Sequence, residues 1–143
     1  MKRCLVDLNI LLALLVQNHD HHKSARRWFD GLVASEAGLC RMVQLGVIRL
    51  LGNAAIMRER ALSASVAWDV VAKLLEDERL DLLNEPSGID SVLPELFRYR
   101  VPTIKLVADA YLAAFAISGS YRLLTFDRGF RQYRGLDLQV LED

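Results

Sequence analysis

The sequence predicts a three-layer α/β fold in which helices cover both faces of a central parallel sheet of about five strands. Five short apolar runs alternate along the chain with longer segments of helical periodicity, a pattern typical of parallel sheets whose crossovers are helices. The chain has 143 residues, of which 52% are hydrophobic, and this suffices for the core of one domain. We therefore expect a single domain spanning residues 1–143.

The predicted strands are the five apolar runs at residues 3–6, 38–41, 80–83, 121–126 and 137–141. The predicted helices have apolar residues three and four positions apart, and they cover residues 9–16, 23–33, 42–51, 64–77, 89–99 and 106–118. A polar loop separates the first two helices. No internal repeat, low-complexity segment or interdomain linker interrupts this order, which supports one continuous fold.

The charge is balanced overall but unevenly distributed along the chain. Lysine plus arginine equals aspartate plus glutamate at 18 each, so no excess of basic residues marks a nucleic-acid-binding protein. Residues 69–95 hold eight acids and two bases, a net charge of −6, whereas residues 98–134 hold seven bases and two acids, a net charge of +5. A polyanion is therefore expected to bind the C-terminal third.

The two cysteines predict a reducing compartment. Cys4 and Cys40 lie in apolar runs without CxxC spacing, which favours buried, reduced thiols. The chain opens without a recognisable signal segment, and its longest unbroken apolar run, at residues 10–16, is too short to span a bilayer. A cytoplasmic location is expected.

Three aspartates are predicted to meet at one edge of the sheet. Asp7 and Asp127 each follow a predicted strand directly, and the carboxyl ends of parallel strands lie at the same edge. Asp109 lies in the first turns of a helix that leads into a strand, so this helix begins at that edge too. Each acid alone also suits a helix cap or a position beside the helix dipole, and Lys105 is a natural partner for Asp109. Their convergence favours a functional site.

Three neighbouring carboxylates predict a site for a divalent cation. They repel one another and raise each other's pKa values unless a cation is present. Magnesium and manganese prefer oxygen ligands, which they share with substrate phosphates, so a phosphodiester is the expected substrate. Such a metal polarises the phosphoryl oxygen, lowers the pKa of a bound water and stabilises the departing 3′ oxygen.

The sequence resembles PIN-domain ribonucleases of the VapC toxin type in three hallmark segments: CLVDLN at residues 4–9, DAYLAAFA at 109–116 and LTFDRGF at 124–130. The similarity covers essentially the whole chain. It implies a PIN-like fold and a magnesium- or manganese-dependent endoribonuclease in which Asp7, Asp109 and Asp127 are the catalytic, metal-holding acids. Asn9 and Thr125 are then nearby polar support.

The same resemblance implies an RNA substrate and a small VapB-like antitoxin as partner. The antitoxin is expected to thread an extended or helical segment along the acidic pocket, its basic side chains neutralising the carboxylates in place of metal. A homodimer is also expected, because the apolar helix surface is large for so short a chain. The expected exposed anchors are Trp28, Phe29, Trp68 and Phe97.

Candidate contacts to RNA phosphates are Arg49, Lys105 and Arg128, since guanidinium and ammonium groups both suit phosphate oxygens. Each of them equally suits a surface salt bridge.

One position departs from the family pattern. Many family members carry a glutamate near the start of the third helix, and the matching position here is Gln44, whose amide supplies no charge. If that helix starts after Arg41, Gln44 is expected near the metal, and glutamate there would tighten metal binding; otherwise Gln44 only caps the helix. Glu85, after the strand at 80–83, is either a compensating acid or an ordinary loop residue before Pro86.

Two alternatives to a metal-dependent ribonuclease remain open. The Asp7-Leu8-Asn9 segment resembles the start of the haloacid-dehalogenase nucleophile motif, but Asn9 stands where that motif needs a second aspartate. Alternatively, the change at position 44 weakens catalysis, and the domain acts as a binding or regulatory module in its antitoxin complex.

The histidine-rich loop at residues 19–22 does not predict a zinc site, because adjacent loop ligands rarely complete a tetrahedron. Asp20 is instead expected to cap the following helix, whose packing face includes His22, Ala25, Trp28 and Phe29.

Overall fold

The computed structural model describes residues 2–98 and 102–142. In chain order its elements are β1 (Cys4–Val6), α1 (Leu8–Leu15), α2 (His22–Asp30), β2 (Ala37–Leu39), α3 (Arg41–Leu51), α4 (Ala54–Met57), the 3-10 turn η1 (Arg58–Arg60), α5 (Ala64–Leu75), β3 (Leu80–Leu82), α6 (Ile89–Phe97), α7 (Leu106–Gly119), β4 (Arg122–Thr125), the 3-10 turn η2 (Arg128–Gln132) and β5 (Leu138–Val140).

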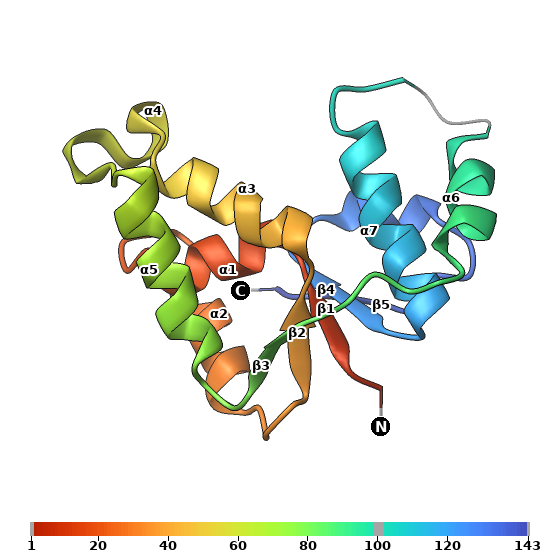
Figure 1. The fold of residues 1–143 in the computed structure, drawn as a ribbon, viewed down its shortest axis with the longest axis horizontal. Helices are drawn as coiled ribbons and strands as arrows, with labels where there is room; N and C mark the ends of the chain where they lie inside the picture. Colours follow the sequence, from red (N-terminus) through yellow and green to blue (C-terminus); the bar gives the residue numbers. More distant parts are fainter. Residues whose placement is uncertain (1, 99–101, 143) are drawn as a thin grey trace.

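The five strands form one parallel sheet in the order β3-β2-β1-β4-β5. In Figure 1, α1 to α5 lie on one side of the strands, and α6 and α7 lie on the other. The predicted three-layer fold with a parallel sheet of five strands is therefore confirmed. Because β1 is central, the residue that follows it lies between both helical layers, at the carboxyl edge of the sheet.

The core is built around the central strands β2, β1 and β4, which are short and buried on both faces. Leu5, Val6, Leu39, Leu123 and Leu124 have no solvent exposure, as expected for a parallel sheet covered by helices. α1 and α7 contribute long apolar surfaces to this core, with buried residues Ile10, Leu11, Leu12, Ala13 and Leu14 in α1 and Ala110, Leu112, Ala113, Ala114, Phe115 and Ala116 in α7. This packing fixes the first turns of α1 and α7 at the edge where the strands end.

Every predicted strand and helix has a counterpart in the structure, and most of the boundaries agree to within about two residues. The exception is α2, which ends at Asp30 rather than at residue 33. Two short elements of the α3–α5 connection, α4 and η1, were not predicted, because four residues are too few to show a helical period. The predicted end of the helix over residues 89–99 lies outside the described residues.

Two predictions for the α2 region are wrong. The N-cap of α2 is His21 and no side chain caps this helix, so Asp20 does not have the expected capping function. Phe29 is buried with 3% exposure, so it is not an exposed anchor: it lies on the packing face with Ala25, and the Arg79 guanidinium covers its ring at 4.0 Å. Trp68 and Phe97 are exposed as expected.

Both cysteines are free, and Cys40 is buried. Among the helices of the described residues, none combines the length and the apolar character needed to cross a membrane.

Candidate active site

The site begins at the junction between β1 and α1, where Asp7 is the N-cap of the helix. Its backbone is extended, and its Oδ1 accepts a hydrogen bond of 2.7 Å from the Leu8 amide. This local geometry turns the chain sharply from strand to helix and holds the carboxyl group at the sheet edge. Only 7% of Asp7 is exposed, so its carboxyl group requires polar partners.

Thr125, the last residue of β4, supplies the principal partner. The parallel register of β1 with β4 brings Thr125 beside Asp7, and its fully buried hydroxyl donates to Asp7 Oδ2 at 2.7 Å. The same Oγ1 accepts hydrogen bonds from Asn9 Nδ2 at 3.2 Å and from the Asp127 amide at 3.0 Å. Thr125 thereby connects the three polar residues that follow β1 and β4.

The other two acids approach from α7 and η2. Asp109 lies in the first turn of α7, half-buried. Asp127 is the N-cap of η2: its Oδ1 accepts from the Gly129 amide at 2.8 Å, and its Oδ2 accepts from Lys105 Nζ at 3.1 Å.

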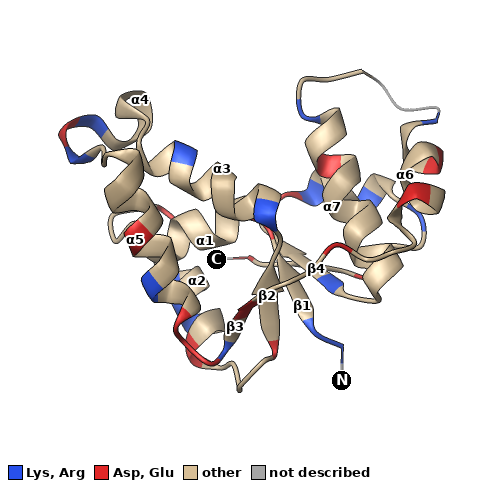
Figure 2. Ribbon diagram, viewed as in Figure 1, with Lys and Arg blue, Asp and Glu red and all other residues tan. Residues whose placement is uncertain are grey.

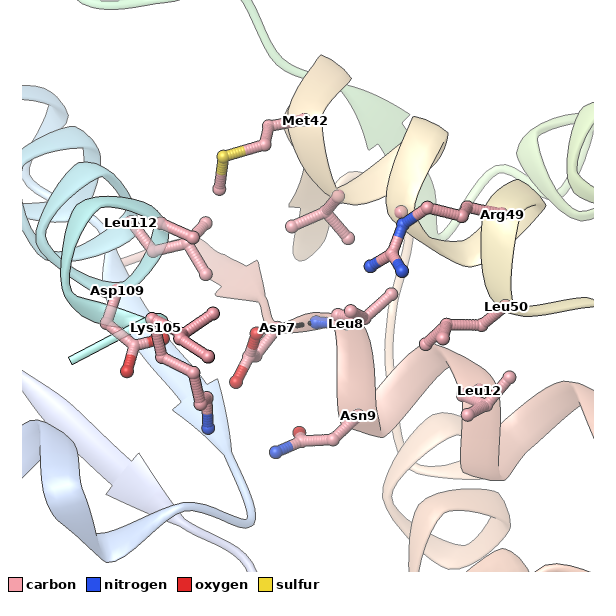
Figure 3. Close-up of a pocket in the computed structure, with 14 residues that line it drawn as sticks. Asp7, Leu8, Asn9, Leu12, Met42, Arg49, Leu50, Lys105, Asp109 and Leu112 are labelled. Atoms are coloured by element: carbon pink, nitrogen blue, oxygen red, sulfur yellow. Dashed lines mark hydrogen bonds between the residues drawn. The ribbon is translucent and has the colours of Figure 1, made fainter. Parts of the chain in front are cut away.

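A cavity of about 390 Å³ lies in front of these residues. Its polar groups come from Asp7, Asn9, Lys105 and Asp109, and Arg49 of α3 adds a guanidinium; its apolar wall includes Leu8, Leu12, Met42, Leu50 and Leu112. In Figure 3, the side chains of Asp7, Asp109 and Lys105 project into the same space from opposite sides. Asp127 does not line this cavity and reaches it through Lys105.

The electrostatics of the three acids differ. Burial raises the pKa of Asp7, although the hydrogen bonds from Thr125 and Leu8 oppose this. Burial also raises the pKa of Asp109, and the charges of Asp7 and Asp127 add to it while Lys105 opposes it. Mutual repulsion was expected to raise all three values, but the pKa of Asp127 is lowered: burial acts to raise it, and hydrogen bonds from Gly129 and Lys105 outweigh that effect.

The donor atoms suit a hard divalent cation. Carboxylate oxygens are the ligands that magnesium and manganese prefer, and a positive charge, the Lys105 ammonium, already lies against them. Within residues 2–98 and 102–142, however, no three histidine, cysteine, aspartate or glutamate side chains converge closely enough to hold a metal as they stand. The oxygen donors are of the kind that such a cation prefers, and a metal held by all three acids would require their side chains to move closer together.

Comparison with known proteins identifies the family of this chain. The sequence model of the PIN domain family matches residues 4–136. This chain belongs to the PIN domain family. The ribonuclease VapC41 of Mycobacterium tuberculosis is 37% identical over 142 residues, which cover 96% of this chain and 97% of that protein. The ribonuclease VapC44 of the same species is 32% identical over 127 residues, covering 88% and 87%.

Solved structures show the same fold as this PIN domain. The DNA-bound VapBC complex of Salmonella typhimurium has a chain that matches with a TM-score of 0.69 and 18% identity, over 98% of each chain. VapC20 of Mycobacterium tuberculosis, described as a toxin that cleaves the sarcin-ricin loop, matches with a TM-score of 0.66 and 19% identity, over 90% and 92%. Membership of the PIN family decides against the dehalogenase-like alternative.

The structure places Gln44 of this PIN domain away from the expected position. Gln44 is buried, its Oε1 accepts a hydrogen bond of 2.6 Å from Arg41, and it does not line the cavity. The face of α3 that does line it carries Met42, Gly46 and Arg49. Residues two positions apart on a helix point in different directions, so Gln44 cannot share the side of Met42 and Gly46.

We predict that Gln44→Glu leaves manganese affinity unchanged, whereas Gly46→Glu tightens it by about tenfold. Only the second variant adds a carboxylate to the cavity, and the β-carbon would lie 3.3 Å from Leu8 Cδ1, a contact that a small side-chain shift relieves. Calorimetric titration of manganese into both variants checks this. If Gln44→Glu binds manganese more tightly than Gly46→Glu, position 44 belongs to the metal site after all.

Of the remaining candidate residues, some line the cavity and others lie outside it. Arg49 lines the cavity, whereas Arg128 lies outside it, in an exposed ion pair of 3.2 Å with Glu142. Glu85 also lies outside, and its Oε1 accepts a hydrogen bond of 2.6 Å from the Tyr111 hydroxyl. Figure 2 shows basic residues on α3 and on the loop after α4 as well as near α7. Binding of a polyanion by the C-terminal third stays a prediction.

The apolar wall of the cavity was not predicted from the sequence. Met42, Leu50 and Leu112 belong to helical stripes that also suit a closed core, and only the packing of α1, α3 and α7 leaves them facing a cavity. The one available signal is the spacing 42, 46, 49, 50 on α3, which marks a single helix face.

Proposed function

We propose that this PIN domain is a magnesium- or manganese-dependent endoribonuclease that a small VapB-like antitoxin neutralises. The observation that carries the proposal is the buried Asp7, held by Thr125 of the neighbouring strand and facing Asp109 across one cavity. Similarity to ribonucleases over nearly the full length of the chain supports the same conclusion.

In this proposal, Asp7, Asp109 and Asp127 hold the metal. When bound, the metal supplies a polarised phosphoryl oxygen and a more acidic water. Thr125 orients Asp7, since a group that hydrogen-bonds to a metal ligand fixes its direction, and Asn9 in turn donates a hydrogen bond to Thr125.

Substrate contacts come from two kinds of side chain around the cavity. Arg49 and Lys105 are positioned to contact phosphates, because both basic groups border the acids. Met42 and Leu112 offer apolar surface to a base or ribose. The single strand of RNA thus lies with its scissile phosphate at the acids, and specificity arises from bases along the wall.

The antitoxin is proposed to occupy the same region. A second hollow shares Leu12 with the cavity and runs past the end of α1 to α4 and η1. Val16, Ile56 and Met57 give it apolar surface, and the rest of its lining is polar or charged: Asn18, His19, Asp20, Arg58, Glu59 and Arg60. An antitoxin segment with apolar and charged side chains along this path and a basic side chain at the carboxylates would exclude both RNA and metal. We place this pairing in the cytoplasm, where Cys4 and Cys40 stay reduced.

Self-association into a homodimer stays a prediction. Its support is the exposed apolar surface, which includes Trp68 and Phe97 as well as Ile104 and Val107 beside the cavity rim. Mass measurement of the purified protein across a dilution series is the corresponding test.

The experiment that tests the function is a digest of total RNA by purified protein, with magnesium, with manganese and with chelator. Discrete cuts that appear only with a divalent ion support the proposal, and cut ends reveal the sequence preference. A folded protein that binds the antitoxin but leaves all RNA intact would instead support the regulatory-module alternative.

A further inference from the structure

Lys105 holds a position in the acidic cluster that a cation would otherwise take. Its Nζ donates to Asp127 Oδ2 at 3.1 Å, and its side chain lines the cavity together with Asp7 and Asp109. Figure 3 shows the ammonium group pointing into the space between the carboxylates of Asp7 and Asp109. One basic group therefore lies among all three acids.

No other basic side chain of the described residues is placed in this way. Arg49 lines the opposite wall of the cavity from α3, and Arg128 pairs with Glu142 outside it. The acids, for their part, are not gathered into a ready metal site. The arrangement is that of carboxylates spread around an ammonium group.

The side chain of Lys105 is free to leave while its backbone stays fixed. Lys105 is the N-cap residue of α7, and its carbonyl accepts the Asp109 amide at 2.9 Å, which anchors the main chain. The side chain is 68% exposed, and its four methylene groups allow the ammonium to turn toward solvent. Displacement thus requires no unwinding of the helix.

We propose that the Lys105 ammonium occupies the cation site in the metal-free protein and competes with the divalent metal for the same carboxylates. When metal binds, the ammonium turns to the cavity mouth and takes an RNA phosphate. This inference rests on the proposed function. It also makes metal and RNA binding cooperative, because a phosphate that engages Lys105 releases the carboxylates to the metal.

The test is calorimetric titration of manganese alone into wild type, Lys105→Met and Lys105→Gln, with Lys23→Met on the exposed face of α2 as the matched control. An exposed ion pair contributes modestly, so removing Lys105 is expected to tighten manganese binding by about fivefold. The Lys23→Met control is expected to bind manganese as wild type does.

Thermal melting adds a readout that a purely structural lysine would not give. Both Lys105 variants are expected to melt below wild type in chelator, because three acids lose their counter-charge. They are expected to gain more than wild type on adding manganese, because binding to the native state stabilises it in proportion to affinity.

Equal or weaker manganese affinity in Lys105→Met and Lys105→Gln, with wild type binding normally, would overturn the competition and leave the proposed ribonuclease function untouched. Failure of both wild type and variants to bind manganese would overturn the competition and the metal-dependent function together. Binding by the variants but not by wild type would support an even stronger competition.

Discussion

The Asp109→Asn protein is expected to cleave RNA about a thousandfold more slowly than wild type in saturating magnesium. Asp109 approaches the cavity from α7, on the side opposite to Asp7, so its loss would remove the proposed metal ligand on that side. The fold should survive, because Asp109 is half-buried and asparagine has nearly the same shape. Initial rates on a defined RNA, with thermal melting of both proteins, measure the effect.

The matched control for this variant is Asp90→Asn. Asp90 lies in the first turn of α6 as Asp109 lies in the first turn of α7, so both acids lie close to a helix N-terminus. If Asp109→Asn and Asp90→Asn both retain wild-type rates, Asp109 stabilises its helix only and the site is wrongly assigned.

The second large effect is expected from Thr125→Val. Valine matches the shape of threonine but leaves Oδ2 of the buried Asp7 without its donor, and Asn9 Nδ2 and the Asp127 amide without their acceptor. We expect a loss of about 2 kcal/mol in the free energy of unfolding, since buried polar groups lose their partners. Metal affinity should fall by about tenfold to a hundredfold, as when groups that orient metal ligands are removed.

Denaturant unfolding and manganese titration measure these two effects. Thr103, the other threonine of the chain, is exposed and supplies the control Thr103→Val. A Thr125→Val protein with wild-type metal affinity would show that Asp7 needs no support from β4 to bind the cation.

The sheet and the three aspartates were predictable from the sequence for a physical reason. The central strands are short apolar runs because parallel strands are buried on both faces, and an acid directly after such a run must lie at the carboxyl edge. Asp7 and Asp127 were placed by this rule, and Asp109 by the direction of its helix. Their functions in catalysis stay predictions.

The side of a helix that faces a cavity was not predictable in the same way. The periodicity of the sequence predicted where α3 begins and ends. The side of α3 that faces the cavity depends on how α1 packs against this helix, and that packing places Gly46 rather than Gln44 at the site. Lys105 is similar: its sequence neighbour Asp109 was the expected partner, but Asp127, distant in sequence, accepts its hydrogen bond. Contacts between distant segments leave no local pattern in a sequence.

The chemistry of the cut ends tests the central claim most directly. Attack by a metal-activated water with departure of the 3′ oxygen leaves a 5′ phosphate on one product and a 3′ hydroxyl on the other. The test is to digest RNA with wild type in magnesium and to identify both termini by mass spectrometry, with Asp109→Asn as the background. The account predicts 5′-phosphate and 3′-hydroxyl ends that are absent from the variant digest. Products ending in a 2′,3′-cyclic phosphate, or cuts that persist undiminished in Asp109→Asn, would contradict it.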